Sequence, residues 1–359
     1  MTTIPCAVDV TTLASGMQAV TISNALVRVT VLPEKGADIY ALVHQPSGID
    51  VLWKSPTGLR PLGHGRASPD STVAWLEHYE GGWQECFPNG GDPCQYGGVE
   101  LSFHGESTML PWQFTVVEQG ERAVVEFFVS LYRSPLRLRR RMILEATTAT
   151  LQLHEQLTNT AAEPIDCMWG HHPAFGAPLV GSSARLATNA RIALADATND
   201  GPHQPLLLGA RGQWPYLPTK TGGLLDLRCL PSNNEPRALL AYLFDFDGAP
   251  WYALSNADAG IGVGMTWPDS AFSCLWLWQE LHASGGFPFY KRVDTMAVEP
   301  WSSYPGHGLT HVMETTQTHL RLGPGETHAS TLVVTLFSID IDQDVRTISP
   351  TGVVELTTM

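Results

Sequence analysis

The sequence has few cationic side chains. It contains 21 Lys and Arg residues against 35 Asp and Glu, which gives a formal net charge of -14 at pH 7. Its one short basic cluster runs from Arg137 to Arg141 within an alternating segment. Because nucleic acids and anionic membranes bind to basic surfaces, neither is an expected partner of this chain.

Long apolar runs and paired cysteines are also missing. No run is long enough to span a bilayer, and the first ten residues lack the charged and then apolar order of a signal peptide. The six cysteines include no CxxC pair, and no HxH or HExxH spacing occurs. These absences argue against a disulfide framework and a zinc site. We therefore expect a cytoplasmic protein with reduced thiols and no metal ion.

Helical periodicity is scarce, and strand-like periodicity is common. Apolar and polar residues alternate, with many β-branched and aromatic side chains, in the segments 19–32, 114–132, 136–157, 251–267 and 330–339. Such alternation is typical of strands with one face on a core and one in water, and 33 glycines and 26 prolines punctuate the chain. No linker or fixed-period repeat divides it. The sequence predicts one all-β domain over residues 1–359, a sandwich of antiparallel sheets.

The stretch CMWGHHPAFG, residues 167–176, contains two adjacent histidines. Pro173 favours an extended conformation for His172, and successive side chains of an extended chain point to opposite faces. We therefore expect only one of His171 and His172 to face a given cleft. A single histidine in a β protein is more often a packing residue than a catalytic one, so this choice needs support from elsewhere in the chain.

Support comes from short motifs that follow one another along the chain. They are Phe87-Pro88-Asn89, His104-Gly105, Pro111-Trp112, His172-Pro173-Ala174-Phe175, Val298-Glu299-Pro300 and Pro324-Gly325-Glu326. In their residues and in their order along the chain, these motifs resemble those of the aldose 1-epimerase (galactose mutarotase) family, and the resemblance spans nearly the whole chain. It implies a β-supersandwich that binds a sugar in an open cleft and interconverts its α and β anomers without a cofactor.

The resemblance also implies a role for each residue of the catalytic set. Opening a hemiacetal requires a base that takes the proton of the anomeric hydroxyl and an acid that protonates the ring oxygen. By resemblance, Glu299 is the base, His172 is the acid, and His104 binds the sugar or acts as a second acid. His171 is then expected to be a packing residue.

Four further residues are expected to bind the substrate: Asn89, Asp245, Trp276 and Gln279. Asp245 stands near Asp247 in LFDFDGAPWY, and an aspartate beside glycine is commonly a turn residue. Trp276 and Trp278 share one face of the expected strand, and Gln279 lies on the other. Tryptophan stacks well on the C–H face of a sugar and equally well in a core.

Two departures from the family pattern bear on the substrate. Gly90 stands where the family has an arginine after the Phe-Pro-Asn turn, and Glu106 stands where it has a phenylalanine after His-Gly. With Glu85 and Glu106 expected beside the cleft, a sugar phosphate would meet like charge. We therefore expect a neutral or amino-bearing aldose as the small-molecule partner of a monomer or homodimer. Two alternatives stay open: a non-catalytic sugar-binding protein, and a lyase or hydrolase on the same architecture.

Overall fold

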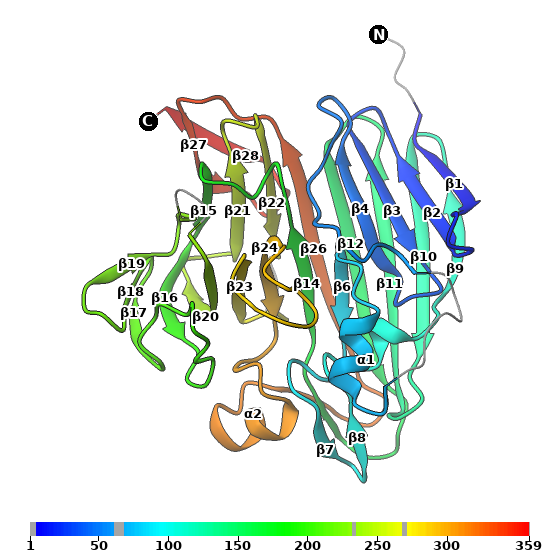
Figure 1. The fold of residues 1–359 in the computed structure, drawn as a ribbon. Coiled ribbons are helices and arrows are strands. Elements are labelled where there is room, and N and C mark those ends of the chain that lie inside the picture. Colours follow the sequence, from blue (N-terminus) through cyan, green and yellow to red (C-terminus); the bar gives the residue numbers. More distant parts are fainter. Residues whose placement is uncertain (1–4, 61–67, 232–234, 268–270, 359) are drawn as a thin grey trace.

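The computed structural model describes residues 5–60, 68–231, 235–267 and 271–358 of the chain. Within these residues the strands form two large antiparallel sheets and four two-stranded ones, with two short helices at one end of the molecule (Figure 1). The predicted all-β antiparallel architecture is confirmed.

The larger sheet has twelve strands among the described residues. In spatial order they are β1 (Ala7–Thr12), β2 (Gln18–Ser23), β3 (Val27–Leu32), β4 (Asp38–His44), β6 (Trp83–Cys86), β14 (Gly170–Phe175), β24 (Asp294–Trp301), β23 (Cys274–Leu281), β20 (Arg237–Phe246), β16 (Ala190–Ala195) and β17 (Arg211–Gln213), with β5 (Ile49–Asp50) paired to β4. The strands β6, β14, β24 and β23 therefore lie in the middle of this sheet.

The second large sheet has eight strands in the described part of the chain. Their order is β15 (Ala184–Thr188), β21 (Trp251–Asn256), β22 (Ile261–Thr266), β26 (Thr327–Phe337), β12 (Thr150–Asn159), β11 (Leu136–Glu145), β10 (Arg122–Ser130) and β9 (Gln113–Glu118). The two-stranded sheets are β7 (Cys94–Tyr96) with β8 (Val99–Leu101), β13 (Ile165–Cys167) with β25 (Leu320–Leu322), β18 (Tyr216–Pro218) with β19 (Leu224–Asp226), and β27 (Gln343–Ile348) with β28 (Val354–Thr358).

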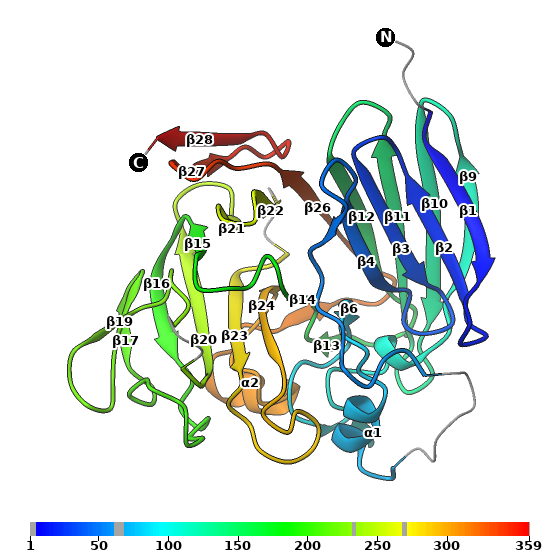
Figure 2. The same ribbon diagram turned by 45° about the horizontal axis from the view of Figure 1, so that its top comes forward.

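The two large sheets pack face to face around an apolar cluster to which both contribute. Val29 on β3, Phe127 on β10 and Leu153 on β12 are fully buried members of this cluster. Figures 1 and 2 show β2–β4 lying over β10–β12. Burying each such side chain contributes roughly 1.5–3 kcal/mol, which makes this interior the main source of stability.

Strand β11 shows how the sequence sets the two faces of a sheet. Leu136 and Leu138 are buried while Arg137 and Arg139 are exposed, as the alternation predicts. The same alternation places Arg140 in the interior, where it is 1% exposed. A buried guanidinium requires carboxylate partners, and these are described with the site below.

The two α-helices lie at the lower end of the molecule in Figure 1. Helix α1 (Ser71–Glu77) begins at Asp70, whose carboxylate accepts hydrogen bonds from the backbone N–H groups of Thr72 and Val73. Helix α2 (Leu309–Thr315) follows β24. Each helix has seven residues, and no helix in the described part of the chain has the length and apolar character needed to cross a bilayer.

Candidate active site

Glu299 and His172 face one pocket from neighbouring strands. Glu299 lies on β24 and His172 on β14, which pair in the middle of the larger sheet. The distance from His172 Nε2 to Glu299 Oε1 is 3.7 Å, and both side chains are nearly buried. The pocket that they line has a volume of about 280 Å³. The structure thus brings together two residues that lie far apart in the sequence.

His104 lines the same pocket from the loop after β8. Its ring centroid is 5.4 Å from that of His172. The backbone N–H of Gly91 donates to His104 Nδ1 over 3.3 Å, so the ring proton of neutral His104 resides on Nε2. Burial and the neighbouring His172 hold the pKa of His104 well below its usual value. His104 is therefore a neutral hydrogen-bond donor at neutral pH.

Burial shifts the pKa values of Glu299 and His172 in opposite directions. Desolvation raises the pKa of Glu299 to about 8 and lowers the pKa of His172 to about 4. Each shift disfavours the charged form of its group. In between these values the pair holds one proton in total, which the desolvated pocket places on Glu299. A carboxyl and an imidazole that share one proton at this distance can both give and accept a proton.

The indole of Trp301 holds the Glu299 carboxylate in place. Its Nε1 donates to Glu299 Oε2 over 2.9 Å, and its ring stacks on Trp276 with centroids 4.0 Å apart. The other side of the ring lies against Gly90 and Gly170, where an added Cβ would come within 2.5 Å and 2.1 Å of ring atoms. Only glycine fits at either position. Trp301 thus fills the space beside Gly90, the position at which the resembling family has an arginine.

Helix α1 and the turn after it form an aromatic wall of the pocket that the sequence analysis missed. Trp75 and Tyr79 stack with ring centroids 4.5 Å apart. Tyr79 lies 5.7 Å from His172, and Trp75 lies 4.9 Å from His104, again between ring centroids. The sequence does contain a signal for this wall. Asp70 is a typical helix N-cap residue, and Trp75 and Tyr79 follow it four positions apart, a spacing that places two side chains on the same face of a helical turn.

His307 also lines the pocket and was not predicted from the sequence. Its Nε2 is 2.8 Å from Asp196 Oδ2 and its Nδ1 is 3.1 Å from Asp92 Oδ2. These two carboxylates raise the pKa of His307 to about 9, so the ring is cationic at neutral pH. His307 and Asp92 both line the pocket. Both ring nitrogens of His307 are taken by these carboxylates, so the group offered to a polar ligand is the Asp92 carboxylate that His307 holds.

Comparisons with known proteins identify a family and a fold. The sequence model described as "Domain of unknown function (DUF4432)" matches residues 14–205, which is more than half of the chain. The chain belongs to this family. No curated protein matches it.

Solved structures with the galactose mutarotase-like fold resemble this one over nearly its whole length. A Klebsiella pneumoniae protein provisionally named an aldose 1-epimerase has a TM-score of 0.69 at 18% identity, covering 92% of this chain and 83% of its own. A galactose mutarotase-like protein from Clostridium acetobutylicum has a TM-score of 0.63 at 13% identity, covering 93% and 99%. Galactose 1-epimerase from Lactobacillus acidophilus has a TM-score of 0.61 at 15% identity, covering 93% and 99%. The chain has the galactose mutarotase-like fold.

Of the four expected substrate-binding residues, Trp276 lines the pocket, and Asn89, Asp245 and Gln279 do not. Trp276 lines it together with Trp278, while Gln279 is buried on the opposite face of β23 and does not line it. Asn89 does not line it either. The Asn89 amide donates to the backbone oxygens of Asp92 and Ser102, and its oxygen accepts from the N–H of Leu309. Asn89 therefore shapes the loop that carries pocket residues.

The placement of Asp245 in the cleft is wrong. Asp245 lies near the end of β20, is exposed, and pairs with Arg191 over 2.7 Å. The residue of β20 that lines the pocket is Leu240. Asp245 and Leu240 are five positions apart on one strand, which separates them along the sheet. Asp247 is also exposed, in the turn that follows.

His171 points away from the pocket into the interior between the sheets, as the alternation predicts. Trp83 Nε1 donates to His171 Nδ1 over 3.1 Å, so the ring proton is on Nε2, which is 3.0 Å from Glu155 Oε2. Arg140 pairs with Glu155 and with Glu85. Glu85, Glu155 and His171 form a cluster with suitable donor atoms for a metal ion, but the guanidinium of Arg140 already supplies positive charge there.

The two acidic residues that were expected beside the cleft are elsewhere. Glu85 is fully buried in the Arg140 network and also accepts a hydrogen bond from Trp169 Nε1. Glu106 accepts hydrogen bonds from the backbone N–H groups of Tyr132 and Arg133. Neither carboxylate lines the pocket. The electrostatic reason for excluding an anionic sugar therefore does not hold.

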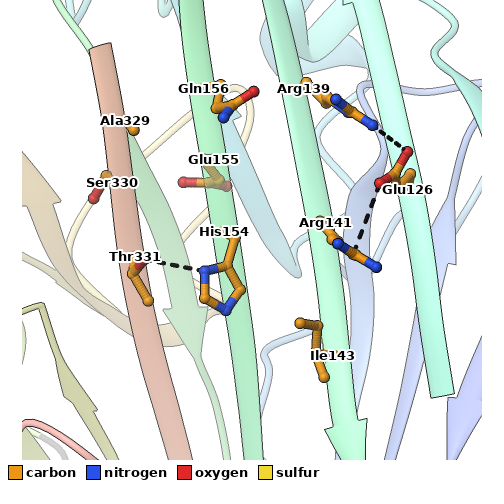
Figure 3. Close-up of a pocket in the computed structure, with 10 residues that line it drawn as sticks. All are labelled: Glu126, Arg139, Arg141, Ile143, His154, Glu155, Gln156, Ala329, Ser330 and Thr331. Carbon is orange, nitrogen blue, oxygen red and sulfur yellow. Dashed lines mark hydrogen bonds and ion pairs between the residues drawn. The ribbon is translucent and has the colours of Figure 1, made fainter. Parts of the chain in front are cut away.

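A separate groove lies on the outer face of the eight-stranded sheet, across β10, β11, β12 and β26 (Figure 3). Its charged groups bind one another: Arg139 and Arg141 approach Glu126 at 2.6 Å and 3.7 Å. His154 Nδ1 lies 3.2 Å from Thr331 Oγ1. Arg139 and Arg141 of the basic cluster thus lie on the outer surface, whereas Arg140 of the same cluster points into the interior.

Proposed function

We propose that this protein is an aldose 1-epimerase, an isomerase that interconverts the α and β anomers of an aldose. The observation that supports it best is the approach of Glu299 Oε1 to His172 Nε2, 3.7 Å apart in a pocket of sugar size. One proton donor and one proton acceptor on neighbouring strands are what ring opening of a hemiacetal requires.

In the proposed reaction the pair exchanges protons with the sugar and ends unchanged. Transfer of the shared proton from Glu299 to His172 gives a carboxylate and an imidazolium. Glu299 then takes the proton of the anomeric hydroxyl while His172 protonates the ring oxygen, and the C1–O5 bond breaks to give the open-chain aldehyde. Rotation about the C1–C2 bond presents the other face of the aldehyde. Return of both protons closes the ring as the other anomer.

The surrounding residues bind and orient the sugar in this proposal. The Nε2–H group of His104 donates a hydrogen bond to a sugar oxygen. Trp75, Trp276 and Trp278 present aromatic surfaces to the apolar C–H faces of the ring. The carboxylate of Asp92, held by the charged ring of His307, accepts hydrogen bonds from hydroxyl groups at the other end of the pocket. These roles need no cofactor.

Polarimetry tests the proposal directly. Freshly dissolved single anomers of a panel of aldoses are followed to equilibrium with the purified protein and with buffer alone, with and without a metal chelator. We expect faster equilibration of at least one aldose, with no effect of the chelator, and loss of the acceleration in Glu299→Gln. Sugar binding by calorimetry without any acceleration would support the non-catalytic alternative and contradict the proposal.

A further inference from the structure

A second pocket adjoins the catalytic one. We call it the side pocket; it is lined by Trp53, Arg60, Tyr79, Phe289, Arg292 and neighbouring residues, and its volume is about 210 Å³. Leu76, Tyr79 and Phe289 line both pockets. The ring of Tyr79 lies between His172, at 5.7 Å, and Trp53, at 5.5 Å, measured between centroids. Only the ring of Tyr79 therefore lies between His172 in the catalytic pocket and Trp53 in the side pocket.

The side pocket contains two arginines that have no acidic partner among the described residues. No carboxylate in that part of the chain forms an ion pair with Arg60 or Arg292, although the chain carries a net charge of -14. The guanidinium of Arg292 instead lies over the ring of Tyr290, 5.9 Å from its centroid. No acidic residue lines the side pocket. Its charge is therefore uncompensated and positive.

Tyr79 supplies an independent observation at the boundary of the two pockets. Its side chain is 95% buried, since only 5% is exposed, and its hydroxyl has no hydrogen-bond partner among the described residues. Leaving a buried hydroxyl unpaired is costly, about 1–3 kcal/mol, so such groups normally have partners. The hydroxyl oxygen is itself enclosed by protein, so Tyr79 presents its aromatic ring to the two pockets.

We propose that the side pocket binds an oxyanion carried by the aldose, so that the preferred substrate is a sugar with a phosphate, sulfonate or carboxylate group away from its anomeric carbon. This inference rests on the proposed epimerase function. The planar forks of Arg60 and Arg292, which both line the side pocket, match the oxygens of such a group. An anionic substrate replaces the expected neutral or amino-bearing aldose. That expectation depended on Glu85 and Glu106 lying beside the cleft, and both are buried elsewhere.

The test compares anionic sugars with their neutral parent. Anomer equilibration is measured for glucose, glucose 6-phosphate and glucuronate with the wild type, Arg60→Ala, Arg292→Ala and the double variant. Lys291→Gln is the matched control, because it removes one positive charge next to Arg292 from a residue that does not line the side pocket. The two anionic sugars distinguish a phosphate from a carboxylate preference.

We expect wild-type kcat/KM to be at least about tenfold higher for an anionic sugar than for glucose. Each arginine variant should reduce that ratio about tenfold, as loss of a charge-assisted hydrogen bond predicts, mainly through KM. Lys291→Gln should retain the wild-type ratio. Equal turnover of neutral and anionic sugars, or a ratio that the arginine variants leave unchanged, would overturn the side-pocket proposal while the epimerase proposal stood.

A binding measurement keeps the two proposals separate. Calorimetry with glucose 6-phosphate and glucuronate is carried out on the wild type, the double arginine variant and Glu299→Gln. Binding that is lost in the double variant and kept in Glu299→Gln supports the side pocket even if no sugar is turned over, in which case the epimerase proposal alone fails. Equal binding by the wild type and the double variant contradicts the side pocket.

Discussion

The indole N–H of Trp301 donates to Glu299 Oε2 and leaves Glu299 Oε1 facing His172. Trp301 follows Glu299 by two positions on β24, so both side chains lie on one face of the strand. Stacking on Trp276 and close contact with Gly90 and Gly170 keep the indole in this position. An aromatic side chain thus orients the proposed base, and the absence of a side chain at Gly90 leaves it the space to do so.

Removing either member of the proton-transfer pair should abolish most of the activity. We expect Glu299→Gln and His172→Asn each to lower kcat about 10²- to 10⁴-fold, the range that general acid or base catalysis contributes. The measurement is anomer equilibration by polarimetry, with circular dichroism to confirm folding. His171→Asn is the control, because its side chain lies on the opposite face of β14 and touches Glu155 and Trp83 instead. An equal loss in all three variants would contradict the assigned roles.

The pH dependence of kcat should be bell-shaped. Below about pH 4 both His172 and Glu299 are protonated and no base is left, while above about pH 8 both have lost their protons and no acid is left. Activity therefore requires the pair to hold one proton, and the two limbs belong to the coupled pair rather than to single residues. Rates at saturating sugar between pH 3 and 10 test this. A profile without an alkaline limb would exclude a proton donor in the pair.

Trp301→Phe should move the alkaline limb to higher pH. The hydrogen bond from Trp301 favours the ionised carboxylate and so lowers the pKa of Glu299 against the effect of burial. Phenylalanine retains much of the ring packing on Trp276 but removes the donor. We expect a kcat reduced about tenfold together with the shifted limb. A reduced rate with an unmoved limb would indicate that Trp301 acts through packing alone.

Much of the fold and the centre of the site were predictable from the sequence. Alternation along 136–157 gave β11 and β12 and separated buried Arg140 from exposed Arg139. The alternation rule also separated His171 from His172, because side-chain direction in a strand depends on position alone. The pairing of Glu299 with His172 followed from the family resemblance, since no local pattern reveals which strands become neighbours.

Residues whose place depends on long-range packing were not predictable in this way. Asp245 was placed in the cleft from its position in the chain, but the register of β20 brings Leu240 there instead. His307 acquires its role from Asp196 and Asp92, which tertiary structure alone brings to it. Glu85 was expected beside the cleft because the loop that contains it, residues 81–85, was expected there. Its strand partner is His171, so it shares the inward face with that histidine.

Adding one methyl group at Gly90 should disturb the catalytic base. Its Cβ would lie 2.5 Å from the ring of Trp301, so the indole must move and its hydrogen bond to Glu299 is lost or weakened. We expect Gly90→Ala to lower kcat at least about tenfold and to lower Tm. Gly201→Ala is the control, because an added Cβ there meets nothing within 4 Å and the backbone has an ordinary φ. Wild-type activity in Gly90→Ala would contradict the role of Trp301 in positioning Glu299.

Glu299 should cost the protein stability at neutral and alkaline pH, and Glu299→Gln should recover it. Burial raises the pKa of Glu299 from about 4.5 in the unfolded chain to about 8 in the folded one, so its burial is tolerated below about pH 4.5. Between about pH 4.5 and 8 the unfolded chain has lost this proton and the folded state keeps it, so stability falls over this range and levels off above pH 8, where the folded state holds a buried carboxylate. Glutamine stays neutral and still accepts the hydrogen bond of Trp301. The Tm advantage of Glu299→Gln over the wild type should therefore grow by about 2 °C or more between pH 4.5 and 8.5.

Thermal unfolding at both pH values measures this advantage, and Glu155→Gln provides the contrast. Glu155 is buried too, but it accepts from Arg140 Nε over 3.0 Å and lies 3.0 Å from His171 Nε2. Neutralising Glu155 weakens a paired network, since the guanidinium of Arg140 loses one of its two carboxylates, and so Tm should fall at both pH values. A Glu299→Gln variant that is less stable than the wild type at pH 8.5 would show that Glu299 serves the packing of the pocket rather than its chemistry.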